Sequence, residues 1–351
     1  MKRDNFLAPV KTALAKRAGY RCSYPGCNAI TVGPSEEGQM AVANTGTAAH
    51  ISAAAGGKGS RRFDKNMTEE QRTSIENGIW CCRDHGTLID TDEVTYSSSM
   101  LRGWRAVAEK KAQLRQAHGD DVQLIEHPDL AKLGLVPDRL TLDGNFLNTS
   151  VGNAVVFSCI AEIWGKEVAD SARDFLIEYA RNCFIHSKAQ AVVIDFVENG
   201  ITVCDDGTQF DLHTLAQPDF GRGGGLAYRA LLSSLRINAV STSRNASNNN
   251  VLTIPLVKDS AGLLAHNPCA LAISHEQLRL NILDFSELSS CNRIYIVAPN
   301  FMTYSDGPRC ETVLETAMKT HENVVLVIPQ VSSAVLEHFR KRFPSTEVLS
   351  W

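Results

Sequence analysis

Apolar and polar residues follow two different spacings along this chain. In three segments the apolar residues recur every three to four positions, which predicts helices at residues 5–18, 100–117 and 169–186. Gly19 directly follows the first segment and ends that helix. The chain therefore begins with a helix that leads into a cysteine-containing loop.

Shorter apolar runs predict strands at residues 48–51, 191–197, 201–204, 251–257, 293–298 and 323–328. The Asn199-Gly200 pair separates the second and third of these runs and predicts a hairpin. A glycine-rich run at residues 221–225 opens a further helix that continues to residue 235. The last two strands flank a predicted helix at residues 310–321, which is a βαβ pattern.

Breaks in these patterns divide the chain into four parts. Residues 118–150 contain prolines, Asp/Gly turns and no sustained period, so we expect a linker there. The expected domains are therefore residues 1–117, 151–258 and 259–351.

Composition narrows the class of protein. With 44% hydrophobic and 21% charged residues, the chain is typical of a globular protein, and no apolar run approaches a membrane span. The N-terminus lacks an apolar signal segment, so we expect a cytoplasmic protein with no membrane partner. The ten cysteines are dispersed, and we expect reduced thiols, some of them bound to metal.

Charge is distributed unevenly. Residues 1–117 contain 17 Lys/Arg against 12 Asp/Glu, whereas the remainder contains 18 against 27. A basic N-terminal part suits a polyanion such as double-stranded DNA. Chance variation between domains would give the same asymmetry.

Two separated pairs of metal-ligand residues lie in the basic part. Cys22 and Cys27 form one pair, and Cys82 and His85 form the other. Together they supply the four ligands of a tetrahedral structural zinc site. Cys81 competes with Cys82, but we expect it to pack as a small apolar residue.

The segment around these pairs resembles the HNH endonucleases. The resemblance rests on Cys22-Ser-Tyr-Pro-Gly-Cys27, Ala48-Ala49-His50-Ile51, Asn77-Gly-Ile-Trp-Cys-Cys82-Arg-Asp-His85 and Leu88-Ile89-Asp90. It implies a ββα-metal fold in which His50 is the general base that activates water. It also implies that Asn77 either fixes the loop or ligates a catalytic Mg²⁺ or Mn²⁺ ion.

This chain departs from the HNH pattern at two positions. Ala49 stands where many members carry an acidic metal ligand, and Gly86 stands where many carry a histidine. The missing ligands are expected among three acidic residues, with the first favoured by the Ile-Asp pattern of a related subgroup: Asp90, Asp64 and Asp92. Three basic residues of a glycine-rich loop are expected to contact DNA phosphates, or else to be solvated: Lys58, Arg61 and Arg62.

A second resemblance covers about residues 165–257. A helix carries Glu178, Asn182 and His186 on one face, and it is followed by Cys204-Asp205-Asp206-Gly207 and then by Gly221-Arg-Gly223-Gly-Gly225. In this order the motifs resemble the GHKL ATP-binding fold of gyrase and sensor histidine kinases. Gln209 departs from the family, which usually has glycine there.

The GHKL resemblance assigns a role to each matching residue. Asn182 would ligate the Mg²⁺ ion that bridges the phosphates, and Glu178 is placed as a water-activating carboxylate in members that hydrolyse ATP. Asp205 would accept the adenine amino group, and Gly207 would let the backbone approach the ring. Three glycines would close over the phosphates: Gly221, Gly223 and Gly225.

Together these observations predict an α+β chain with an N-terminal ββα-metal HNH domain, a GHKL α/β sandwich and a C-terminal α/β extension. We expect a metal-dependent DNA endonuclease that is regulated by ATP binding or hydrolysis, forms a homodimer and acts in anti-phage defence. Alternatives are an ATPase–nuclease of DNA repair and a zinc-stapled DNA-binding protein without catalysis.

Overall fold

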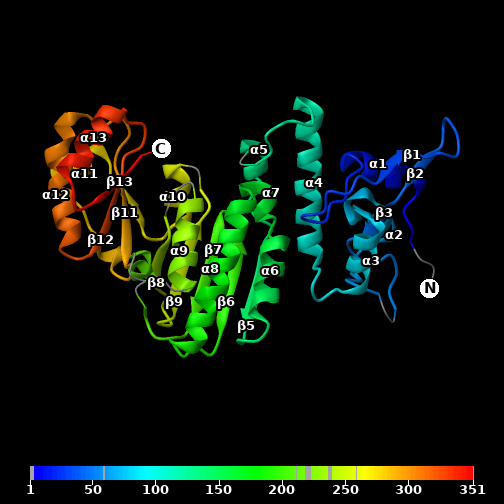
Figure 1. Ribbon diagram of the computed structural model, residues 1–351, viewed down its shortest axis with the longest axis horizontal. Coiled ribbons are helices and arrows are strands. Elements are labelled where there is room, and N and C mark those ends of the chain that lie inside the picture. The colour runs from blue at the N-terminus through cyan, green and yellow to red at the C-terminus, as the bar shows by residue number, and fades with distance from the viewer. Residues whose placement is uncertain are drawn as a thin grey trace. The chain divides into compact units, whose positions relative to one another are not determined.

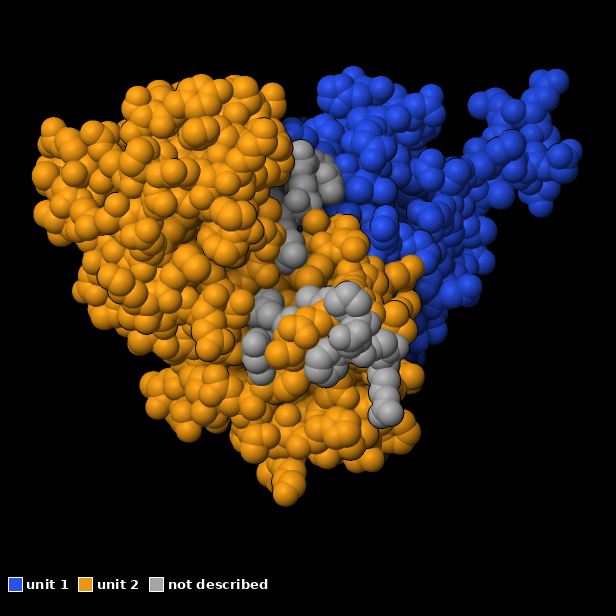
Figure 2. Space-filling model, turned by 60° about the vertical axis from the view of Figure 1, so that its left-hand side comes forward, with its two compact units in different colours: residues 1–138, 152–169 blue, residues 139–151, 170–351 orange. Residues whose placement is uncertain are grey.

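The computed structural model describes residues 4–57, 60–125, 127–210, 212–217, 223–235, 239–257 and 259–350. The chain folds into two compact units, coloured separately in Figure 2. Unit 1 contains residues 1–138 and 152–169, and unit 2 contains residues 139–151 and 170–351. Helices α6 (Leu147–Phe157) and α8 (Lys166–Ile185) both run across the boundary between the units.

Unit 1 is built around two antiparallel strands followed by a helix. Strand β3 (Gly46–His50) pairs with β4 (Gly78–Cys82), and α3 (Arg83–Thr91) follows β4 directly. Before them comes α1 (Ala8–Arg17), which starts later than expected because Pro9 occupies its first turn. The other elements are β1 (Val32–Pro34), β2 (Val42–Asn44), α2 (Glu69–Thr73), η1 (Ile75–Asn77), α4 (Ser98–His118), α5 (Pro128–Ala131) and α7 (Ile160–Trp164).

Aromatic rings fill the centre of unit 1. Trp104 of α4 is 1% exposed and donates its indole N–H to the carbonyl of Phe157 at 2.8 Å. The Trp104 and Phe157 rings lie 5.5 Å apart, and Tyr24 and Tyr96 pack against them. Residues 152–169 therefore complete the core of unit 1, although they begin 70 residues after the end of β4 at Cys82.

Unit 2 begins with a five-stranded sheet in the order β5-β6-β7-β9-β8 (Figure 1). Strand β5 (Asp138–Leu142) lies within the segment expected to be a linker, and it forms one edge of this sheet. The remaining strands are β6 (Val192–Val197), β7 (Gly200–Asp205), β8 (Ser241–Arg244) and β9 (Asn250–Pro255). A short 3-10 turn, η2 (Leu212–Ala216), precedes helix α9 (Gly223–Ser234).

The predicted hairpin forms, with its turn shifted by one residue. Val197 pairs with Gly200, so Glu198 and Asn199 make the turn and Gly200 belongs to β7. A Cβ on Gly200 would lie 2.6 Å from the Ile254 carbonyl oxygen of β9. Close packing of the neighbouring strand, rather than turn geometry, therefore requires glycine at this position.

The last part of unit 2 is a parallel sheet in the order β10-β11-β12-β13, which confirms the predicted βαβ pattern. Its strands are β10 (Ala270–Ala272), β11 (Arg293–Val297), β12 (Asn323–Val327) and β13 (Glu347–Leu349). Its helices are α10 (Ser260–His266), α11 (His275–Leu280), α12 (Gly307–Met318) and α13 (Ser333–Arg342), with 3-10 turns η3 (Ser286–Leu288) and η4 (Tyr304–Asp306).

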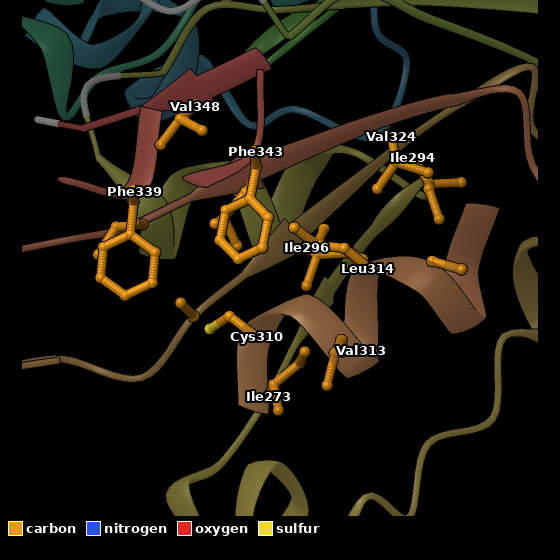
Figure 3. Packing of buried hydrophobic residues seen from close by; sticks show 14 of the residues in the cluster. Ile273, Ile294, Ile296, Cys310, Val313, Leu314, Val324, Phe339, Phe343 and Val348 are labelled. Atoms are coloured by element: carbon orange, nitrogen blue, oxygen red, sulfur yellow. The ribbon is translucent and has the colours of Figure 1, made fainter. Parts of the chain in front are cut away.

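Alternate residues of β11 enter two different cores. Ile294 and Ile296 pack with α12 and α13 on one face of the parallel sheet (Figure 3). Tyr295 and Val297 pack on the other face, in a cluster that includes Ala239 just before β8. The two sheets of unit 2 therefore share a hydrophobic cluster. Among the described residues, no helix has both the length and the apolar character of a membrane span.

Candidate metal centre and nucleotide cavity

Four metal-ligand side chains from separate segments of unit 1 meet at one point: Cys22, Cys27, Cys82 and His85. Their ligand atoms all lie within 4.8 Å of one another. His85 Nδ1 is 3.1 Å from Cys82 Sγ and 3.6 Å from Cys22 Sγ. A tetrahedral zinc ion, with bonds of about 2.3 Å to sulfur and about 2.0 Å to nitrogen, separates two ligands by roughly 3.5 Å. The group can therefore bind a metal ion such as zinc.

The neighbouring thiol of Cys81 stays outside this group. It is fully buried, and its hydrogen bond to Cys22 is the main reason that the pKa of Cys22 is lowered to about 5. Burial instead raises the pKa of Cys27 to about 11. The hydrogen bond from Cys81 thus favours the thiolate form of Cys22, which is the form that binds metal. Cys82 rather than Cys81 completes the set, as expected.

A partly buried carboxylate of α7 supports the Cys22–Cys27 loop. Glu162 Oε1 accepts a hydrogen bond from the backbone N–H of Gly26 at 2.9 Å, and its other oxygen pairs with Lys111. Burial raises the pKa of Glu162, but the Lys111 charge outweighs this effect and holds it below its usual value. Sequence reasoning missed Glu162 because more than 130 residues separate it from the loop and no motif marks it.

His50 ends β3 opposite Gly78 and is 8% exposed. Its ring stacks on Phe6 with centroids 3.9 Å apart. Nε2 lies 3.2 Å from the backbone oxygen of Asp4. Because a carbonyl oxygen only accepts, we assign the proton of the neutral ring to Nε2, which leaves Nδ1 as the basic nitrogen.

Asn77 holds the chain that follows His50. Its Oδ1 accepts from the Ser52 N–H at 2.8 Å, and its Nδ2 donates to the Ser52 and Arg72 carbonyls at 2.9 and 3.0 Å. The side chain is 1% exposed. Of the two roles expected for Asn77, this geometry fits the fixing of the loop, because both of its amide atoms are engaged by backbone groups.

Arg62 has a different position from the one expected. Its side chain is 5% exposed, so it is not a surface contact for a phosphate. Instead the guanidinium donates to backbone carbonyls that lie on both sides of the hairpin–helix motif: Ile51, Ile89, Asp92 and Tyr96. It thereby ties the segment after His50 to α3. The sequence places Arg62 in a glycine-rich loop and does not reveal that its guanidinium is buried against these carbonyls.

The other predicted residues of this region are more exposed. The Arg61 side chain is 43% exposed and lies 3.9 Å from Glu93. The Asp90 side chain is 46% exposed, and its carboxylate lies 3.9 Å from the Arg62 guanidinium. Lys58 lies outside the described residues.

The structure shows no second group of metal ligands around His50 among the described residues. Among the residues that the structure describes, only the Cys22 group brings three or more His, Cys, Asp or Glu side chains close enough to share an ion. Asp90, Asp64 and Asp92 therefore do not gather into a ready catalytic site.

Unit 2 contains a cavity of about 540 Å³ between α8, the start of α9 and the five-stranded sheet. This volume lies in the range of small-molecule sites. The cavity is lined by most of the residues predicted for a nucleotide: Glu178, Asn182, His186, Asp205, Gly223 and Gly225. Gly207 adjoins it through a hydrogen bond from its N–H to Asp205 Oδ1, and Gly221 lies outside the described residues.

The first two glycines of α9 lie close to side-chain ends of α8. A Cβ on Gly223 would lie 2.9 Å from Glu178 Oε2, and one on Gly224 would lie 2.8 Å from Asn182 Nδ2. The N-terminus of a 12-residue helix therefore approaches the polar face of α8 closely. Backbone N–H groups at such an end attract anions.

Asp205 forms the polar floor of the cavity. It is 2% exposed, and its carboxylate accepts from Tyr179 Oη, Asn250 Nδ2 and Gly207 N at 2.9–3.0 Å. The Cys183 thiol also hydrogen-bonds to this carboxylate. A thiol is a weak donor, so an N–H group of a ligand can take its place. Tyr179 and Asn250 are supporting residues that sequence reasoning missed. Tyr179 is one position after Glu178 on the expected helix, and Asn250 lies next to the predicted strand at 251–257.

Two cysteines correct the expectation that the thiols are reduced. Cys269 and Cys291 form a disulfide in unit 2. The sequence does not predict it because only the parallel pairing of β10 and β11 brings the two positions together.

Comparison of the chain with protein-family models, with curated proteins and with solved structures finds no match. Functional inference therefore depends on the side chains of this chain and on their geometry.

Proposed function

We propose that this protein is a DNA endonuclease whose catalytic base is His50. The observation that carries the proposal is the placement of His50 at the end of β3. Strand β3 pairs with β4, and β4 and the following helix α3 supply Cys82 and His85 of the Cys₃His group. The HNH resemblance assigns the same hairpin and helix to phosphodiester hydrolysis. The basic balance of residues 1–117 favours a polyanionic substrate.

His50 is suited to remove a proton from water. The Asp4 carbonyl holds the ring by Nε2, and the stacked Phe6 ring fixes its plane. The imidazole then accepts a proton as the water oxygen attacks phosphorus, and the P–O3′ bond breaks, with the leaving 3′ oxygen taking a proton from solvent. Arg61, with its exposed side chain, is the residue available to contact a phosphate. The Cys₃His group would hold zinc as a structural staple.

We further propose that the cavity of unit 2 binds ATP and that binding regulates cleavage. The base would enter at Asp205, and the phosphates would face the N-terminus of α9. Asn182 would contribute to the Mg²⁺ ion that accompanies the phosphates. Ordering of this cavity by ATP would shift the chain toward a cutting state.

Supercoiled plasmid cleavage with Mg²⁺ or Mn²⁺, with and without ATP, tests both proposals. His50→Ala should lower the rate by roughly 10²–10⁴-fold while DNA binding persists. The matched control is His118→Ala, which changes an exposed histidine at the end of α4. Cleavage by His50→Ala at the wild-type rate would refute the role of His50. DNA binding by the wild type without any cleavage would favour a non-catalytic zinc-stapled protein.

A further inference from the structure

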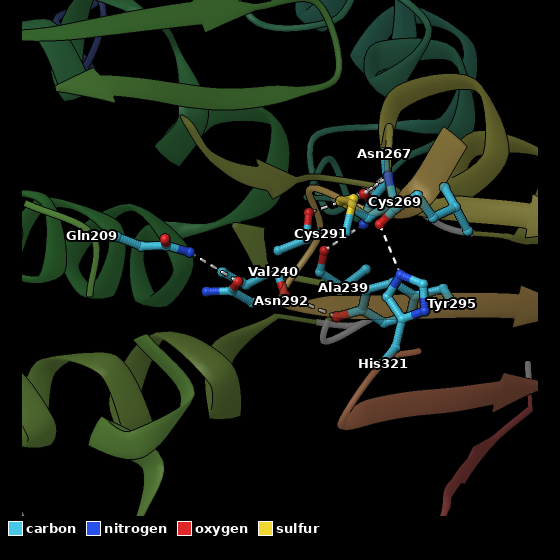
Figure 4. Close-up of a disulfide and its surroundings, with 11 residues drawn as sticks. Gln209, Ala239, Val240, Asn267, Cys269, Cys291, Asn292, Tyr295 and His321 are labelled. Atoms are coloured by element: carbon cyan, nitrogen blue, oxygen red, sulfur yellow. Dashed lines mark hydrogen bonds between the residues drawn. A yellow bond between two sulfur atoms is a disulfide. The ribbon is translucent and has the colours of Figure 1, made fainter. Parts of the chain in front are cut away.

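The residue that follows a disulfide cysteine reaches the nucleotide cavity from the parallel sheet. Asn292 lies between Cys291 and the first residue of β11 (Figure 4). Its side chain lines the cavity. Among the described residues that line the cavity, Asn292 is the one that comes from the C-terminal sheet, β10–β13. The cavity is therefore completed by a part of the chain that the GHKL resemblance does not cover.

Backbone contacts hold Asn292 from two sides. Its N–H donates to the Thr242 carbonyl of β8 at 3.0 Å, and its own carbonyl accepts from Asn323 Nδ2 at 3.2 Å. Its side-chain Oδ1 lies 3.4 Å from Gln209 Nε2. Gln209 is the position at which this chain departs from the usual glycine, so the departure coincides with the partner of Asn292.

Further contacts fix the same edge of the five-stranded sheet. Tyr295 Oη donates to the Val240 carbonyl at 2.9 Å, and Asn267 Nδ2 donates to the Ala239 carbonyl at 2.8 Å (Figure 4). Asn267 and Asn292 lie two residues before and one residue after the cysteines of the disulfide. The disulfide thus joins both segments that support β8.

One buried polar atom in this wall points to a ligand. Thr242 lines the cavity and is 9% exposed, and its hydroxyl has no hydrogen-bond partner among the described residues. A buried hydroxyl without a partner is unfavourable, so a polar ligand group at this wall would be stabilised. Asn292 is bonded to the same residue through its backbone.

We propose that Asn292 is a base-specificity residue of the nucleotide site, supplied by the C-terminal sheet, and that it selects adenine. The Asn292 backbone bonds to β8, β8 pairs with β9, and Asn250 of β9 bonds to Asp205, so we place the Asn292 amide at the base end of the cavity. An asparagine amide matches the amino group and N7 of adenine, whereas guanine presents two acceptors there. The two amine hydrogens allow Asp205 and Asn292 to accept one each. This inference rests on the proposed ATP site.

The test is calorimetric titration of the full chain with Mg·ATP, Mg·GTP and inorganic tripolyphosphate. Asn292→Ala should weaken ATP binding roughly fivefold to hundredfold, as expected for the loss of two neutral hydrogen bonds. GTP and tripolyphosphate affinities should stay unchanged. Asn300→Ala, an exposed asparagine beyond the other end of β11, is the matched control. If Asn292→Ala folds poorly, Gln209→Ala is the second test, because it removes the hydrogen-bond partner of the Asn292 side chain. Gln209→Ala should also reduce the preference for ATP over GTP.

The outcomes separate the two levels of the proposal. If the wild type binds none of the three compounds at millimolar concentration, the ATP site itself is refuted, together with the role of Asn292. If wild type binds ATP and Asn292→Ala binds it within twofold, only the specificity role is refuted. Equal weakening toward ATP and tripolyphosphate would also refute it, because that pattern indicates a general loss of structure.

Discussion

Replacement of Asn77 by alanine should destabilise unit 1 by about 3 kcal/mol. The mutation removes three neutral hydrogen bonds of 2.8–3.0 Å from a side chain that is 1% exposed. Each such bond contributes about 1 kcal/mol, and the buried Ser52 N–H would lose its acceptor. The loss is a substantial part of the roughly 5–15 kcal/mol that stabilises a domain.

Urea unfolding followed by tryptophan fluorescence measures this change in the right unit. Three of the four tryptophans, Trp80, Trp104 and Trp164, lie in unit 1. Asn66→Ala, an exposed asparagine of the same unit, should stay within about 0.5 kcal/mol of wild type. If Asn77→Ala unfolds within 1 kcal/mol of wild type and yet loses DNA cleavage, the loop-fixing role is wrong and a ligand role for Asn77 is favoured.

Three other predictions address the metal group, an ion pair and the disulfide. Elemental analysis should find about one zinc per chain, and Cys22→Ser should lose both zinc and stability; folded wild type without zinc would contradict this. Burial raises the pKa of Glu109, but hydrogen bonds from Arg17 and Arg105 hold this pKa below its usual value. The Glu109 carboxylate therefore stabilises the fold above the unfolded pKa of about 4.3, and this stabilisation is lost as pH falls. Glu109→Gln should therefore unfold more easily at pH 7, and the difference from wild type should shrink below about pH 4; a constant difference would argue against the ion pair. Replacement of both Cys269 and Cys291 by serine opens a loop with a separation of 22 residues and should destabilise unit 2 by about 3 kcal/mol. Thermal melts followed by circular dichroism measure this change, and an unchanged melt would show that the disulfide does not stabilise the fold.

Local patterns in the sequence predict most of the elements but not their partners. The helices near residues 5–18, 100–117 and 169–186 appear as α1, α4 and α8 because their apolar spacing decides them locally. Strand β5 was missed because its sequence, Asp-Arg-Leu-Thr-Leu, is short and half polar. Its place at a sheet edge depends on partners that lie more than 50 residues away.

The same limit applies to the functional residues. Cys22, Cys27, Cys82 and His85 could be predicted because metal ligands occur in short, spaced pairs. Arg62 was assigned to the surface because loop composition says nothing of the four carbonyls that gather around its guanidinium. Asn292 carries no local signal, since its importance arises from the pairing of distant segments.

The path of the chain between the units has a consequence for synthesis on the ribosome. Residues 152–169 belong to unit 1, yet they follow β5, which belongs to the sheet of unit 2. The indole of Trp104 and the N–H of Gly26 find their partners in Phe157 and Glu162 only after this stretch has emerged. A nascent chain interrupted near residue 138 would therefore leave Trp104 without its core partner. The segment that completes unit 1 is carried by α6 and α8, two helices that continue into unit 2, so the two units share their helices as the chain is made.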